Sequence, residues 1–221
     1  MKNLSRAINR NTHYFTGYLI FAFTLTVFCF GFKKADGFLL INGFHFQSLD
    51  NFFVLFTQFG NGLFVMVIVI LMLVLKKIGW AFQTVISFLV SGLCTQLIKH
   101  CIYSPRPKAF FGSGVSIHYI QGITYAGNNS FPSGHSATIF ALTTLLSFYF
   151  PDKKWGLFFL TMAILTGFSR IYLSQHFPID VLAGAIIGGI VSLAIYRYFP
   201  VESFEKKFSK NGWEHQSVKL Q

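Results

Sequence analysis

The sequence predicts an all-α, polytopic membrane protein with six transmembrane helices and an interfacial helical segment after the first of them. Of its 221 residues, 53% are apolar and only 11% are charged, whereas a soluble domain carries about 25% charged residues. The mean hydropathy is +0.54. The charged residues lie in short clusters at the ends of apolar runs, as in the loops that flank membrane helices. This composition excludes a disordered chain, a disulfide scaffold and an ordinary water-soluble enzyme.

Six apolar stretches are long enough to cross a bilayer with modest thinning or tilt. They cover residues 14–32, 61–75, 79–102, 134–150, 155–173 and 178–199. The first stretch follows a basic flank, as a signal peptide would, but it ends without a small-x-small cleavage pattern. We therefore expect a retained membrane helix. The second and fourth stretches are short, which leaves their ends open.

The segment from Leu39 to Gly60 is apolar but interrupted by polar residues such as Asn42 and Asp50. Its six phenylalanines suit an amphipathic segment that lies in the membrane interface. A re-entrant segment is the alternative. Residues 1–200 then form a single transmembrane domain, and residues 201–221 form a polar cytoplasmic tail.

The net charge of +11 comes from 18 basic and 7 acidic residues, and no helix or face concentrates it. This distribution favours a membrane protein over a nucleic-acid-binding one. With a cytoplasmic N-terminus, both termini lie inside and the loop over residues 104–133 lies outside. The basic residues outside are then six of the eighteen, namely Lys33, Lys34, Lys99, Arg106, Lys108 and Arg170.

Two further patterns concern packing and metals. Gly184-x3-Gly188, with the neighbouring alanines, predicts a small-residue face on the last helix that allows close helix packing. The three cysteines form no disulfide framework, and no two histidines stand at zinc-site spacing with a cysteine or carboxylate. We expect no metal and no cofactor.

Polar residues lie where four of the predicted helices end on the outer side. They are Lys99 and Arg106 after the third helix, Ser133, Gly134 and His135 at the start of the fourth, Arg170 at the end of the fifth, and His176 and Asp180 at the start of the sixth. Charged groups in or at the mouth of membrane helices are costly, which makes them functional candidates.

The chemistry of this set points to a phosphate. Lys99, Arg106 and Arg170 are three cations that accompany a single carboxylate, so the site has to meet an anion, and guanidinium forks suit phosphate oxygens. Ser133 and Gly134 at a helix start offer backbone N–H groups and the positive end of a helix dipole.

Two histidines complete the set. Asp180 lies four residues after His176, so the two share one face if the helix begins near Pro178. The carboxylate can then hold one imidazole N–H and leave the other ring nitrogen free to attack. His135, at the neighbouring helix start, is placed to donate a proton. Together these residues predict the transfer of a phosphoryl group to histidine.

Three ordered motifs carry a family resemblance. Lys99-x6-Arg106-Pro107, Pro132-Ser133-Gly134-His135 and Ser169-Arg170-x5-His176-x3-Asp180 resemble, without a departure in spacing, the three-part signature of the type 2 phosphatidic acid phosphatase superfamily. The resemblance covers about residues 60–199. It implies a metal-independent lipid phosphatase with a six-helix membrane fold.

The resemblance also implies a role for each residue. His176 would be the nucleophile that forms a phosphohistidine, Asp180 would orient it, and His135 would protonate the leaving alkoxide and then activate water. The phosphoryl oxygens would be bound by Lys99, Arg106, Ser133, Gly134 and Arg170.

The expected partners are a lipid phosphate and the bilayer, without nucleic acid, and the sequence names no protein partner. Candidate lipids, by resemblance, are undecaprenyl diphosphate, a lipid A phosphate, phosphatidylglycerol phosphate and phosphatidate. The expected location is a bacterial inner membrane, with the site facing the periplasm. Selectivity is expected in the outer loop over residues 108–131, where His118, Tyr119, Gln121 and Tyr125 could touch a headgroup.

The same residues are compatible with other functions. A non-catalytic lipid-phosphate binder or transporter would need the cations but not the nucleophile and its carboxylate. Vanadium-dependent haloperoxidases share the constellation but are soluble and larger, which the membrane helices disfavour. Taken singly, each residue could also be a helix cap or an interface anchor.

Overall fold

The computed structural model describes residues 2–120, 122–123 and 129–201, and these residues form helices but no β-strand. The helices are α1 (Lys2–Arg10), α2 (Thr12–Gly31), α3 (Lys34–Asn42), α4 (Gln47–Phe56), the 3-10 helix η1 (Thr57–Gly60), α5 (Gly62–Val74), α6 (Ile78–Cys101), α7 (Pro107–Phe111), α8 (Gly134–Tyr149), α9 (Lys153–Tyr172) and α10 (Pro178–Tyr198). The predicted all-α class is confirmed. The six apolar stretches correspond to α2, α5, α6, α8, α9 and α10.

Four of the described helices, α2, α6, α9 and α10, are long and apolar enough to cross a membrane. A fifth span arises if α4–η1 and α5, which meet at an angle of 58°, form one broken span. Helix α8 has only 16 residues, about 24 Å at 1.5 Å per residue, which is less than the hydrocarbon thickness of about 30 Å. The total of six membrane helices therefore stays a prediction.

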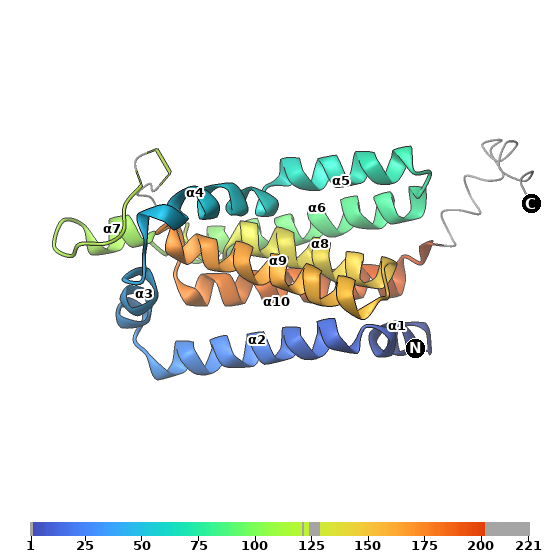
Figure 1. Ribbon diagram of the computed structural model, residues 1–221, viewed down its shortest axis with the longest axis horizontal. Helices are drawn as coiled ribbons and strands as arrows, with labels where there is room; N and C mark the ends of the chain where they lie inside the picture. Colours follow the sequence, from blue (N-terminus) through green and yellow to red (C-terminus); the bar gives the residue numbers. More distant parts are fainter. Residues whose placement is uncertain (1, 121, 124–128, 202–221) are drawn as a thin grey trace, which may run out of the picture.

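Helix α8 lies in the middle of the bundle, packed against α6, α9 and α10. Helix α2 runs along the outside against α9 and α10, and α5 runs beside α6 at the opposite edge (Figure 1). The buried Tyr14 hydroxyl of α2 hydrogen-bonds Thr143 and Thr144 of α8 at 3.0 and 2.9 Å. A short polar contact thus ties the peripheral helix to the central one.

The segment predicted to be interfacial, or alternatively re-entrant, comprises the end of α3 together with α4 and η1. Helix α3 crosses one end of the bundle, where α7 also lies, whereas α1 and the last turn of α10 lie at the other end (Figure 1). Phe38 of α3 is fully buried against Phe177, with ring centroids 5.3 Å apart. Phe53 of α4 packs on Tyr172 of α9 in the same way, at 4.4 Å. These aromatic contacts hold the segment against the bundle end.

Helices α8 and α9 begin at residues whose side chains accept from free backbone N–H groups. Ser133 accepts from the N–H of Ser136 at the start of α8, and Asp152 accepts from Lys154 at the start of α9. Pro178 occupies the first position of α10, where its missing N–H costs nothing. The predicted start of this helix near Pro178 is confirmed.

Glycines allow α8 and α10 to approach closely. A Cβ atom at Gly184 would lie 2.3 Å from the Ser133 carbonyl oxygen, and one at Gly188 would lie 2.3 Å from that of Ala137. No side chain fits in this space. The small-residue packing face predicted for the last helix is therefore confirmed, and its partner is α8.

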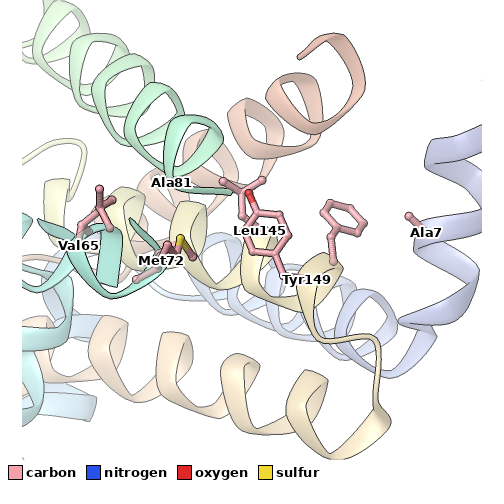
Figure 2. Close-up of a cluster of buried hydrophobic side chains, with 9 residues drawn as sticks. Ala7, Val65, Met72, Ala81, Leu145 and Tyr149 are labelled. Atoms are coloured by element: carbon pink, nitrogen blue, oxygen red, sulfur yellow. The ribbon is translucent and has the colours of Figure 1, made fainter. Parts of the chain in front are cut away.

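An apolar cluster anchors the bundle at the end away from α3 and α7. Figure 2 shows side chains from α1, α5, α6 and α8 meeting there. The cluster comprises Ala7, Val65, Val69, Met72, Ala81, Leu142, Leu145, Phe148 and Tyr149. The Tyr149 ring also stacks on Trp80 with centroids 4.5 Å apart, and its hydroxyl donates to Gln83 at 2.8 Å. Apolar burial of this kind stabilises the bundle, but because it is non-directional it does not determine the geometry of polar groups at the opposite end.

The close approach of α10 to α8 yields a testable prediction. We expect Gly188→Ala to destabilise the protein by about 1–3 kcal/mol, because the new methyl group overpacks a backbone contact. Gly92→Ala in α6 is the matched control, since a Cβ there would meet nothing within 4 Å. The measurement is the thermal unfolding midpoint of each purified variant in detergent. Equal midpoints for the two variants would contradict the packing described.

Candidate active site

The predicted site residues gather at the end of the bundle where α8 and α10 begin. The backbone N–H of Ser133 donates to the backbone oxygen of Asp180 at 2.9 Å, which joins the two helix starts. The close contact at Gly184, one turn further into α10, permits this bond. The second and third motifs are therefore held together by the backbone itself.

His176 and Asp180 form a buried pair. The Nδ1 atom of His176 lies 3.4 Å from Oδ2 of Asp180, and the exposed fractions of the two side chains are 2% and 0%. The same carboxylate oxygen accepts from the Ser130 hydroxyl at 2.5 Å and from the Phe177 N–H at 2.9 Å. The Ser130 oxygen is also 3.4 Å from His176 Nδ1. The Ser130 hydroxyl and the Phe177 N–H thus hold the carboxylate beside the imidazole.

The partners of the His176 ring determine which nitrogen is available for chemistry. A carboxylate only accepts hydrogen bonds, so Nδ1 carries the hydrogen and Nε2 of the neutral ring keeps its lone pair. Burial lowers the pKa of His176 to about 3, while Asp180 opposes this shift and the charges of Arg170 and Arg106 add to it. The ring is therefore neutral near pH 7, with Nε2 free to act as a nucleophile.

Arg170, at the end of α9, lies in the wall of the site. Its side chain is only 5% exposed, and its guanidinium donates to the Thr57 hydroxyl at 2.6 Å. Its backbone oxygen accepts from the N–H groups of Gln175 and His176 at 2.9 and 3.1 Å. Arg170 consequently positions both its own charge and the loop that carries His176.

Arg106 and Lys99 belong to the first motif and approach the site from the end of α6 and the segment after it. The Arg106 guanidinium donates to the backbone and side-chain oxygens of Gln175 at 3.1 and 2.9 Å. The Lys99 ammonium donates to the backbone oxygens of Asn129 and Ser130 at 2.5 and 3.4 Å. All of these acceptors are uncharged. These acceptors hold the two cations beside the His176 loop and the Ser130 segment, and neutral acceptors of this kind are ones that an anion can outcompete.

His135 lies in the first turn of α8. A Cβ at Gly60 of η1 would come within 2.8 Å of the His135 Cβ, so the 3-10 helix lies directly against it. The charges of Arg170, His176 and Arg106 act on the His135 ring, which places it among the same groups. The structure thus brings both histidines to one site.

Ser133 and Gly134 form the first turn of the same helix. The Ser133 oxygen accepts from the Ser136 N–H at 3.3 Å and from the Ser136 hydroxyl at 2.9 Å. Its backbone N–H is taken by Asp180. The Ser133 hydroxyl hydrogen and the Gly134 N–H are the groups of this turn that can reach an oxyanion.

The comparison with protein families agrees with the geometry. The family model described as the PAP2 superfamily matches residues 80–203, which is more than half of the chain and includes every predicted site residue. The chain belongs to the PAP2 superfamily. The resemblance found in the three motifs is confirmed.

Individual relatives of this PAP2 protein carry the names of lipid phosphatases. A lipid A 1-phosphatase from Rhizobium etli is 32% identical over 135 residues, which are 61% of this chain and 56% of that protein. This chain therefore spans little more than half of that relative. Undecaprenyl-diphosphatase BcrC from Bacillus subtilis is 28% identical over 159 residues, covering 70% of this chain and 77% of that protein. Among solved structures, Aquifex aeolicus LpxE matches with a TM-score of 0.67 at 27% identity, over 75% of this chain and 95% of that one.

Three residues that hold the PAP2 motifs in place were not predicted from the sequence. Ser130 binds the carboxylate, Gln175 binds Arg106, and Thr57 binds Arg170. Gln175 stands inside the third motif, and Ser130 stands two residues before the second, so proximity to a motif is a usable signal for both. Thr57 is distant from every motif and carries no such signal.

The other histidines differ in exposure. His13 and His100 are exposed. His118 is not exposed but contacts Asp50 at 2.8 Å. Gln121, Tyr125, His215 and the tail beyond Val201 lie outside the described residues. Within the described residues, no group of three or more His, Cys, Asp or Glu side chains is arranged to hold a metal ion.

The cation cluster predicts oxyanion binding to this PAP2 protein. We expect Arg106→Leu to weaken the binding of orthophosphate by about tenfold or more, since a hydrogen bond to a charged group contributes about 1.5–3 kcal/mol. Arg106→Lys keeps the charge but loses the two-pronged guanidinium geometry. Its dissociation constant should lie between those of the wild-type protein and Arg106→Leu. Isothermal titration of the purified protein in detergent measures the dissociation constants.

Arg197→Leu is the control, because Arg197 lies in the last turn of α10, at the end of the bundle away from the site. Equal weakening in the Arg106 and Arg197 variants would show that net charge rather than the cluster attracts the anion.

Proposed function

We propose that this protein is an integral-membrane lipid phosphatase that hydrolyses the phosphate monoester or diphosphate of an envelope lipid through a phosphohistidine intermediate. The observation that carries this proposal is the buried His176–Asp180 pair, whose Nε2 is left free beside Arg106 and Arg170. A binder would need the cations alone. The orienting carboxylate has a chemical purpose only if the imidazole attacks.

The first step forms a bond between Nε2 of His176 and the phosphorus atom of the substrate. The bond between phosphorus and the lipid oxygen breaks, and His135, which enters this step in its protonated form, gives the leaving alkoxide a proton. Asp180 stabilises the positive charge that develops on the His176 ring. Lys99, Arg106 and Arg170 stabilise the charge on the transferring oxygens, together with Ser133 and the Gly134 N–H.

The second step returns the enzyme to its starting state. His135, now neutral, takes a proton from a water molecule that attacks the phosphorus atom. The bond from phosphorus to Nε2 breaks, and inorganic phosphate leaves. Atoms and charges balance with water as the only co-reactant, so the mechanism that we propose needs no metal ion.

The names of the relatives support the substrate class. The Rhizobium relative is named for lipid A and the Bacillus relative for undecaprenyl diphosphate, so the shared chemistry is a phosphate on a large amphiphile. We propose the same class here, together with phosphatidylglycerol phosphate and phosphatidate as candidates. Apolar helices around the site agree with a substrate that stays in the bilayer.

We further propose that the protein spans a bacterial inner membrane with the site facing the periplasm and both termini facing the cytoplasm. The excess of Lys and Arg at the end opposite the site supports this orientation.

The mechanism predicts that release of free phosphate resists a chelator and depends on His176. We expect His176→Ala to lower kcat by about a thousandfold or more, and Asp180→Asn to cost nearly as much because the tautomer is lost. The measurement uses purified protein, EDTA and a panel of the four candidate lipids. His100→Ala, an exposed histidine on α6, is the control.

Different outcomes separate the alternatives. Activity that survives His176→Ala, or that EDTA abolishes, contradicts the histidine mechanism. Binding of the lipids without turnover by the wild-type protein favours the binder or transporter. Alkaline quenching with a radiolabelled lipid phosphate should trap label on the wild-type protein and none on His176→Ala.

The orientation predicts which residues a membrane-impermeant maleimide can reach in intact cells with a permeable outer membrane. In a background without native cysteines, Ser113→Cys should react and Lys153→Cys should not. Both positions are exposed, one after α7 and one at the start of α9. The reverse labelling pattern would place the site on the cytoplasmic side.

A further inference from the structure

A polar cavity lies beside the candidate active site and is not used by the mechanism above. It has a volume of about 310 Å³ and lies between the turn after α3 and the loop segment over residues 116–119. Its polar lining comprises Asn42, His45, Ser116, His118 and Tyr119. A cavity of this size and lining is a candidate for a small polar group.

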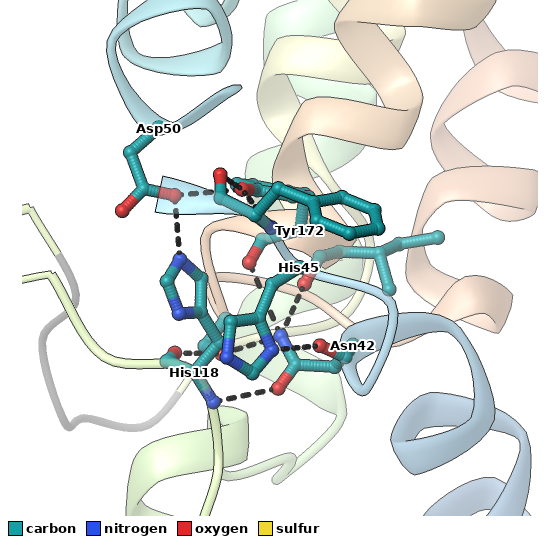
Figure 3. A network of polar contacts seen from close by, with 8 residues as sticks. Asn42, His45, Asp50, His118 and Tyr172 are labelled. Atoms are coloured by element: carbon teal, nitrogen blue, oxygen red, sulfur yellow. Dashed lines mark hydrogen bonds and ion pairs between the residues drawn. The ribbon is translucent and has the colours of Figure 1, made fainter. Parts of the chain in front are cut away.

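A network of hydrogen bonds keeps this cavity in shape (Figure 3). The buried Asn42 amide donates to Ser174 Oγ at 3.0 Å and accepts from the His118 N–H at 2.8 Å. The Asp50 carboxylate accepts from the Tyr172 hydroxyl at 2.6 Å and contacts His118 Nε2 at 2.8 Å. The cavity is therefore built before any ligand arrives.

The contacts of the two histidines determine what the cavity can recognise. His118 Nε2 faces the Asp50 carboxylate, and His45 Nδ1 faces the Asn42 carbonyl oxygen at 3.1 Å. Both partners are acceptors, so both of these nitrogens carry hydrogen. In an imidazole that carries one hydrogen, the opposite ring nitrogen is an acceptor. The rings stack with centroids 4.2 Å apart, so the two acceptors lie on one rigid platform.

Hydroxyl groups of Ser116 and Tyr119 line the same space, and Lys108 Nζ lies 4.1 Å from the centre of the Tyr119 ring. Imidazole acceptors combined with hydroxyls complement a ligand that carries several O–H groups. A hydrocarbon chain would desolvate these polar groups without replacing their hydrogen bonds, which is costly.

The cavity is next to the phosphate-binding cluster along two paths. Ser174, which donates to the His118 backbone oxygen at 2.7 Å, is followed by Gln175, which holds Arg106, and then by His176. Lys108 is two residues beyond Arg106 on the other path. The residues that line the cavity are therefore linked, through Ser174 and through Lys108, to the segments that carry His176 and Arg106.

We propose that this cavity is a headgroup subsite that binds the hydroxyl groups of a saccharide or glycerol unit attached to the substrate phosphate. The inference rests on the proposed phosphatase function and narrows its substrate class. Lipid phosphates whose phosphate-bearing unit has free hydroxyl groups are preferred over phosphatidate, whose two other glycerol hydroxyls are acylated, and over polyprenyl diphosphates, which have none.

The test compares Michaelis constants for lipids that share a phosphate monoester. The hydroxylated substrates are a glucosamine-disaccharide lipid 1-phosphate and phosphatidylglycerol phosphate, and phosphatidate is the substrate without hydroxyls. His45→Phe keeps a stacking ring but removes the acceptor. We expect KM to rise about tenfold for a hydroxylated lipid, the effect of one lost hydrogen bond, and to stay unchanged for phosphatidate, with kcat unchanged throughout. The lipid that shows the larger effect identifies the saccharide or the glycerol as the ligand.

Two controls keep the result interpretable. His100→Phe changes an exposed histidine outside the cavity. It should leave KM unchanged for hydroxylated lipids and for phosphatidate. Tyr119→Phe changes a side chain that is 49% exposed and serves as the second test variant if His45→Phe does not fold. Dissociation constants measured in the His176→Ala background, with each lipid in nanodiscs, should show the same preference without turnover.

The two proposals fail in different ways. Suppose that the wild-type protein hydrolyses the lipids but the cavity variants change KM equally for all substrates or for none. The subsite proposal is then wrong, and the proposed phosphatase function is unaffected. If the wild-type protein hydrolyses none of them, the proposed function fails. An absence of preference in the nanodisc measurement overturns the subsite by itself.

Discussion

The buried carboxylate of Asp180 is the constraint on which the rest of the site depends. Its exposed fraction is 0%, and a buried charge is costly unless hydrogen bonds or an opposite charge compensate it. The hydroxyl of Ser130, the backbone of Phe177 and the ring of His176 supply these partners. They come from the segment before α8, the start of α10 and the loop after α9. The contacts made by Oδ2 therefore bring three chain segments together, whereas the buried Oδ1 has no hydrogen-bond partner among the described residues.

The same residue also links the site to the packing of the bundle. The backbone oxygen of Asp180 holds the N–H of Ser133, and this bond requires the helix axes to be as close as Gly184 and Gly188 allow. The start of α8 then places His135 against Gly60. The position of the second histidine is thus a consequence of small residues in α10 and η1, which carry no chemistry themselves. The packing of α8 against α10 therefore also sets the geometry of the candidate site.

The sequence was most informative where a relation is local. The four-residue spacing of His176 and Asp180, the start of α10 at Pro178 and the small face at Gly184 and Gly188 each follow from the geometry of a single helix. Ser130, Gln175 and Thr57 were missed because their partners lie far along the chain or across a loop, where spacing carries no information. The number of membrane spans does not follow from hydropathy alone, for a related reason. Helix α8 is buried by its neighbours, so its length is set by packing as well as by the bilayer.

The neutral acceptors that position the three cations are compatible with the binding of an anion. Arg106 and Lys99 donate to amide and backbone oxygens, and Arg170 donates to a hydroxyl. Such partners position a charge without neutralising it. Hydrogen bonds between two charged groups are roughly twice as strong as those between neutral groups, so an incoming oxyanion gains more than these neutral acceptors lose. A carboxylate in their place would have occupied the cluster permanently. The one carboxylate that is present instead faces His176, where it orients the ring and leaves the excess positive charge for the phosphoryl group.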